Sequence, residues 1–122
     1  MGGYGVRQFT WRRRLFHADL VAQITVLDEG VHALLTGGEC SHVGAVALAW
    51  NGELLSCPSF PGHKEQVICE RWALALSREL GGCATAACGI HYDNAAPEQI
   101  KAVLSVSDEL LQTALTELKK ER

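Results

Sequence analysis

Long hydrophobic runs are missing from this sequence, and no stretch approaches the roughly 20 apolar residues that a membrane-spanning helix needs. An excess of positive charge is missing as well, because 11 Lys and Arg face 14 Asp and Glu and give a net charge of −3. Such a chain has no basic field that would hold nucleic acid or anionic lipid. The first five residues also lack the charged and apolar regions of a signal peptide, so we expect a cytoplasmic protein.

Paired metal-binding and disulfide motifs are absent too. The five cysteines are an odd number without a C-x-x-C pair, which argues against a disulfide framework and a structural zinc site. Cys57, Cys83 and Cys88 lie in apolar runs and are expected to be small buried residues, whereas Cys40 lies in a polar turn and is expected to be exposed. No histidine pair has the H-x₃-H spacing, so the sequence favours no metal site.

What the chain does have is the composition of an ordinary globular domain. Of its 122 residues, 48% are hydrophobic and 20% are charged, which excludes a disordered protein. This length predicts one domain over residues 1–122, long enough to bury its own core.

Runs of β-branched and aromatic residues predict strands throughout the first half of the chain. The expected strands are Val6–Phe16, Leu20–Leu27, Val31–Leu35, Val43–Trp50 and Glu53–Cys57. Asn51-Gly52 predicts a tight hairpin between the last two, because both residues tolerate a positive φ.

The hydrophobic period changes in the second half. Apolar residues recur at helical spacing in His63–Leu80 and again in Glu98–Lys119, with a strand-length apolar run, Cys83–Ile90, between them. Gly81-Gly82 is expected to end the first of these helices. The fold class is therefore α+β, a mostly antiparallel sheet of about six strands with two helices packed on one face. Two helices leave the other face or an edge of the sheet to be covered, which predicts a homodimer.

Three polar segments carry side chains that could bind an anion or move a proton. Gly37-Gly38 and His42 lie in the first, where adjacent glycines let backbone N–H groups converge on a phosphate or a flat ring. Taken alone, this segment is better explained as a wide hairpin turn with a surface histidine. Gly62-His63-Lys64 begins a predicted helix, where a cation is unfavourable unless an anion neutralises it. Glu65 offers a local counter-charge, so a structural role for this segment stays open.

The third segment leaves the predicted strand Cys83–Ile90 and enters the last helix. His91 is expected at the carboxyl edge of the strand, where sheets covered by helices commonly bind ligands. Asp93 could orient His91 or cap the helix, and Asn94 could do the same. A helix cap explains Asp93 or Asn94 but not the whole segment, which favours a functional site.

Read together, Gly37 to Ala47, Pro61 to Glu65 and Gly89 to Ala95 resemble the LpdD-like family. These small proteins are associated with UbiD-type decarboxylases, including gallate decarboxylase, and are thought to be prenylated-flavin chaperones. The resemblance covers nearly the whole chain and implies a fold like that of the proteasome assembly chaperones. It also implies a non-catalytic dimer that binds reduced prenylated FMN and delivers it to an apo UbiD-type decarboxylase. The cofactor-binding residues expected from these motifs are Gly37, Gly38, His42, Gly62, His63, Lys64, His91, Asp93 and Asn94.

Two alternatives remain at this point. One is a small enzyme subunit, a lyase or a metal-assisted hydrolase, in which His63 and His91 act with Asp93 as acid–base or metal-binding groups. The other is an assembly factor that binds a partner protein and no small molecule.

Overall fold

The computed structural model describes residues 5–58 and 65–121, and six strands and two helices lie within these ranges. In chain order they are β1 (Arg7–Leu15), β2 (Ala18–Val26), β3 (Val31–Gly38), β4 (Ala45–Trp50), β5 (Glu53–Ser56), α1 (Gln66–Leu80), β6 (Cys83–His91) and α2 (Pro97–Lys120). This order of elements is the predicted one. Neither helix is long and apolar enough to cross a membrane.

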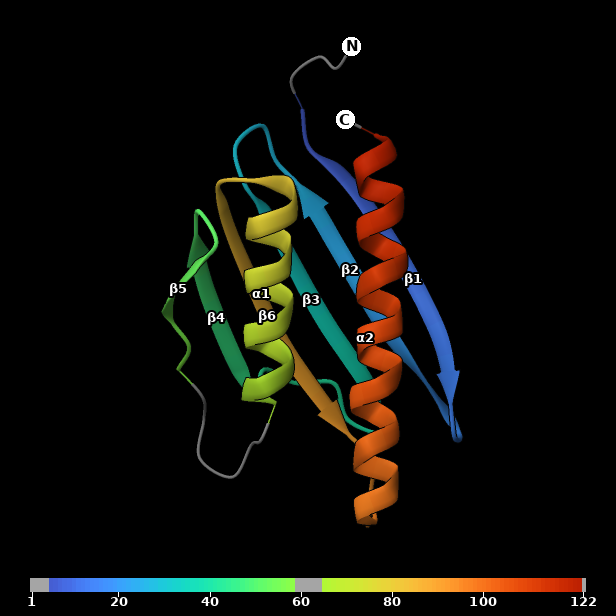
Figure 1. The fold of residues 1–122 in the computed structure, drawn as a ribbon. Helices are drawn as coiled ribbons and strands as arrows, with labels where there is room; N and C mark the ends of the chain where they lie inside the picture. The colour runs from blue at the N-terminus through green and yellow to red at the C-terminus, as the bar shows by residue number, and fades with distance from the viewer. Residues whose placement is uncertain (1–4, 59–64, 122) are drawn as a thin grey trace.

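The six strands form one sheet in the order β1-β2-β3-β6-β4-β5. Only β3 and β6 run parallel, so the prediction of a mostly antiparallel sheet is confirmed. Both helices lie over the same face, α1 over β4 and β6 and α2 toward β1 (Figure 1). Although β6 is the last strand in the sequence, it lies between β3 and β4 in the sheet. The connection from β3 to β4 therefore has to pass the end of β6.

The turns follow the expected residue chemistry. Asn51 and Gly52 have φ of 48° and 81°, which gives β4 and β5 the tight hairpin that the sequence predicts. Gly81, with φ of 83°, caps α1, and its N–H donates to the Ser77 carbonyl at 2.9 Å. At the start of α2 the N-cap residue is Ala96, which has no polar side chain. Gln99 Oε1 instead accepts from the Ala96 N–H at 2.7 Å and satisfies one donor of this helix end.

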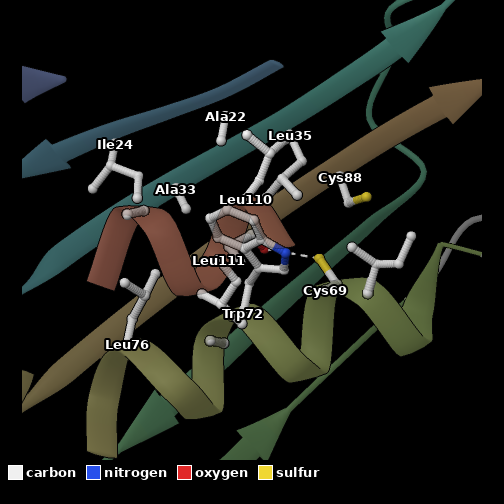
Figure 2. Close-up of a cluster of buried hydrophobic side chains, with 14 of the residues drawn as sticks. Ala22, Ile24, Ala33, Leu35, Cys69, Trp72, Leu76, Cys88, Leu110 and Leu111 are labelled. Atoms are coloured by element: carbon white, nitrogen blue, oxygen red, sulfur yellow. Dashed lines mark hydrogen bonds between the residues drawn. The ribbon is translucent and has the colours of Figure 1, made fainter. Parts of the chain in front are cut away.

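The core lies between the sheet and the two helices. Trp72 of α1 is fully buried, and its indole Nε1 donates to Ser107 Oγ of α2 at 2.9 Å. Figure 2 shows Trp72 facing the sheet, where small residues such as Ala22 and Ala33 leave room for its ring. Trp72 thus contacts α2 and packs on the sheet, which holds the two helices against it. Complete burial of another large apolar side chain, such as Leu110, stabilises the fold by about 1.5–3 kcal/mol.

The cysteines differ partly from the prediction. Cys88 is buried, as expected, and Cys57 is partly exposed. The prediction that Cys83 is buried is wrong, because it is the first residue of β6 and lies at the exposed end of the strand. Cys40 is exposed, as predicted. Desolvation raises the pKa of the buried Cys69 thiol to about 12, so this thiol stays protonated at neutral pH.

Candidate functional site

The described motif segments meet at one end of the molecule. Because β3 and β6 are parallel, their carboxyl ends lie side by side, and Gly38 pairs with His91 in the register. The first turns of α1 and α2 lie at this same end (Figure 1). The N-terminus of a helix carries about half a positive charge and unpaired N–H donors. Two helix ends and two strand ends thus surround the candidate site.

Close packing against neighbouring strands explains two glycines of the first motif. Gly38 has φ of 84°, and a Cβ atom at this position would overlap the His91 carbonyl oxygen. A Cβ atom on Gly37 would approach Leu20 Cδ1 to 2.7 Å. The N–H of Glu39 donates to the His91 carbonyl at 2.8 Å and continues the pairing beyond the strand. The structure therefore gives these glycines a packing role, and their contact with a ligand stays a prediction.

The connection from β3 to β4 passes directly over β6. A Cβ atom on Gly89 would overlap the His42 carbonyl oxygen, and the Gly44 N–H donates to the Cys88 carbonyl at 2.9 Å. Glycine at position 89 is thus required for the close approach of the loop. The predicted wide turn around His42 is a bridge across the end of β6.

His42 forms a largely buried pair with Glu65. The His42 Nδ1 lies 2.9 Å from the Cys40 carbonyl and must carry a proton there, and Nε2 lies 2.9 Å from Glu65 Oε1. The contact between His42 Nε2 and Glu65 Oε1 needs one proton between the two atoms. The pair is therefore either an imidazolium with a carboxylate or a neutral imidazole with a carboxylic acid. Glu65 is the N-cap residue of α1 and is buried. This pair places His42 beside the start of α1.

His91 and Asp93 form a second, exposed pair. His91 Nε2 lies 2.6 Å from Asp93 Oδ1, so Asp93 contacts the His91 ring, as one of its two predicted roles requires. Glu39 links this pair to the β1–β2 turn, since its carboxylate accepts from the Asp93 N–H at 2.9 Å and contacts His17 Nε2. Desolvation acts to raise the pKa of Glu39, but the hydrogen bonds from Asp93 and His17 outweigh it and hold this pKa below its ordinary value.

Aromatic rings gather around Tyr92, the residue between His91 and Asp93 in the chain. Tyr92 is buried, and its hydroxyl donates to the Ala18 carbonyl at 3.3 Å. Its ring meets the rings of Phe16 and His17 edge to face, at centroid distances of 5.6 and 5.9 Å. Desolvation raises the pKa of Tyr92, so the hydroxyl remains a neutral donor.

Glu39, His91 and Asp93 are also a group that could hold a metal ion. Their ligand atoms lie within 4.8 Å of one another, and all three residues are exposed. Carboxylate and imidazole ligands of this kind suit a divalent cation better than an anion. Sequence spacing did not reveal this group, because its members come together only through the pairing of β3 with β6.

Three predicted site residues, Gly62, His63 and Lys64, lie outside the described residues. The described ones gather around two pairs, His42 with Glu65 and His91 with Asp93. Asn94 follows the second pair and has φ of 55°, a conformation that asparagine tolerates. In this structure it turns the chain toward α2.

Some residues were missed or interpreted differently by sequence reasoning. Glu39 lies inside a motif but is not among the predicted site residues. Phe16 is predicted only as the end of a strand, and His17 only as part of the connection that follows it. Arg71 of α1 pairs with Asp108 of α2 at 3.0 Å and links the two helices.

Comparison with known proteins identifies the family. Residues 16–119 match the model described as the prenylated flavin chaperone LpdD-like domain. The chain belongs to this family. It is 28% identical over 107 residues to Protein LpdD of Lactiplantibacillus plantarum, a match that covers 84% of this chain and 77% of that protein. Membership in a chaperone family indicates a non-catalytic protein, as the sequence predicts, and argues against the alternative of a lyase or hydrolase subunit.

The fold is that of a proteasome assembly chaperone. A solved structure of a chaperone complex for yeast 20S proteasome assembly contains a chain that superposes with a TM-score of 0.65. The match covers 95% of this LpdD-like chain and 97% of the other, at 12% sequence identity. At this identity the similarity concerns the fold alone, and it confirms the fold that the sequence resemblance implied.

Proposed function

We propose that this LpdD-like protein binds reduced prenylated FMN and delivers it to an apo UbiD-type aromatic acid decarboxylase. The family description supports a prenylated flavin as the carried ligand. The observation that carries the proposal further is the gathering of the motifs, because the pairing of Gly38 with His91 brings two of them to one end of the sheet. This is the end at which α1 and α2 begin (Figure 1). A phosphate-bearing ligand suits such an end.

The charges suggest how the ligand is oriented. The Glu39 and Asp93 carboxylates lie just beyond the paired ends of β3 and β6, and they would repel a phosphate placed beside them. The start of α1 offers a helix N-terminus, preceded in the sequence by Gly62-His63-Lys64. The Glu65 carboxylate at this start is buried and already paired with His42. We therefore assign the phosphate to the side of α1. The ribityl hydroxyls and the ring then belong to the side of His91, Asp93 and Asn94, where the Asp93 carboxylate can accept from hydroxyl or N–H groups.

A carrier must also release its ligand. The side chains of His91 and Asp93 are 52% and 66% exposed, so contacts with them form and break without unfolding of the core. The proposal involves no covalent bond to the flavin. Transfer needs only that the apo-decarboxylase binds the flavin more tightly than the carrier does.

A homodimer belongs to the same proposal. The sheet face opposite the helices carries partly buried and exposed apolar side chains that alternate with the core positions. They are Val21, Leu34, Val46, Leu48 and Trp50. Apolar side chains gathered on one open sheet face are a common sign of an interface, and a second copy would cover them. We place the dimer and its decarboxylase partner in the cytoplasm, as the sequence predicts.

Anaerobic titration tests the binding step. The purified protein is mixed with reduced and with oxidised prenylated FMN, and binding of the reduced form is expected. Lys64→Ala is expected to weaken it, whereas Lys101→Ala, which removes an exposed lysine from α2, leaves it unchanged. Loaded protein is then added to an apo UbiD-type decarboxylase, and activity is expected to appear. Binding of neither form of the flavin would exclude the proposed function.

A further inference from the structure

Phe16 holds an unusual backbone conformation at the edge of the site. It is the first of two residues that connect β1 to β2, and its φ is 58°. This left-handed region suits glycine or asparagine, and a bulky residue there is a strained exception. The residue is nevertheless 43% exposed, so burial of its side chain offsets only part of that cost. Strained residues of this kind cluster where ligands bind.

Several contacts fasten this turn to the candidate site. The Phe16 ring lies edge to face against Tyr92, with ring planes at 87°. The next residue, His17, contacts both the Tyr92 ring and the Glu39 carboxylate. His17 links the turn to the second pair, because the Glu39 carboxylate that it contacts also accepts from the Asp93 N–H. The exposed Phe16 ring, which precedes His17 in the chain, therefore lies at the edge of the site.

The chemistry of an exposed ring indicates what it would contact. A glycine at position 16 would adopt the turn without strain and would present no surface. Phenylalanine offers a flat apolar surface and no hydrogen-bonding group, so it selects a flat apolar partner, either stacked or edge-on. On the assignment above, the ring of the flavin lies on this side of the site and the phosphate lies near α1.

We propose that Phe16 is a ligand-contacting residue whose ring packs against the flat ring system of the carried flavin. The inference rests on the proposed function and adds the β1–β2 turn to the site as a further wall. The strained turn holds the ring in position before the ligand arrives, which reduces the ordering cost of binding.

Two readouts distinguish this role from a structural one. Phe16→Gly and Phe16→Asn remove the ring and relieve the strain, so we expect the Kd for reduced prenylated FMN to rise about tenfold. The melting temperature of the unliganded protein is expected to stay the same or to rise by about 2–4 °C. Phe16→Trp keeps a flat ring and is expected to bind within roughly threefold of the wild type.

Asn51→Gly is the matched control. It relieves a comparable left-handed turn, with φ of 48°, in the β4–β5 hairpin at the other end of the molecule, and flavin affinity is expected to stay unchanged. Wild-type affinity in Phe16→Gly would overturn the inference while leaving the proposed function intact. Equal losses of affinity and of melting temperature in the Gly, Asn and Trp variants would assign Phe16 a structural role instead. Failure of the wild type itself to bind the flavin would overturn both.

Discussion

Substitution of Gly38 by alanine tests the geometry on which the site depends. Two costs arise at this position. The left-handed φ of 84° disfavours any Cβ by about 1–2 kcal/mol. The added Cβ would also overlap the His91 carbonyl oxygen, which belongs to the backbone of β6 and cannot rotate away. A shift of the two strand ends to relieve such an overlap costs about 1–3 kcal/mol. The free energy of unfolding should therefore fall by about 2–5 kcal/mol.

Two other glycines separate these costs. Gly81 has φ of 83°, and within the described part of the chain a Cβ there meets no atom within 4 Å, so Gly81→Ala measures the strain alone. Gly89 has no positive φ, but its Cβ would overlap the His42 carbonyl, so Gly89→Ala measures the overlap alone. Urea unfolding of the three variants should rank Gly38→Ala as the most destabilising, with a loss near the sum of the other two. A loss in Gly38→Ala no larger than that in Gly81→Ala would refute the close approach of β3 and β6.

Two further predictions concern charge and assembly. The folded pKa of Glu39 lies below its ordinary value of 4.5, so its contribution to stability is present above that value and is lost as pH falls through the folded pKa. Wild type should be more stable than Glu39→Gln at neutral pH, and urea unfolding should show the difference vanish in acid; a difference that is independent of pH would contradict this. For the dimer, Leu48→Glu places a charge on the open sheet face and should yield a monomer in light scattering, whereas Val67→Glu at an exposed position on α1 should not. A wild type that is already monomeric would exclude the dimer.

Local sequence patterns were sufficient to predict most of the fold. The period of hydrophobic residues distinguishes β4 from α1. Asn51-Gly52 and Gly81 mark where these elements end, because these residues adopt the positive φ that the turns require. The order of strands was not predictable in the same way. The insertion of β6 between β3 and β4 depends on contacts between residues about 50 positions apart, such as Gly38 with His91, which no local pattern encodes.

The same distinction applies to the site. His42, His91 and Asp93 could be chosen as candidate residues because each lies in a polar turn next to a predicted strand or helix end. Glu39 was passed over as a site residue because its importance arises from partners on other elements, the Asp93 N–H and His17. Phe16 could not be identified from the sequence, since neither its left-handed φ nor its contact with Tyr92 follows from the residues around it.

The central claim is that this end of the molecule holds a reduced prenylated flavin. The most direct measurement is the visible absorption spectrum of the protein after anaerobic loading with reduced prenylated FMN and removal of unbound ligand. We expect one retained flavin per site in the wild type, with clearly less retained by Lys64→Ala and by Phe16→Gly. A wild-type protein that emerges without flavin would show that this end of the molecule does not hold the cofactor.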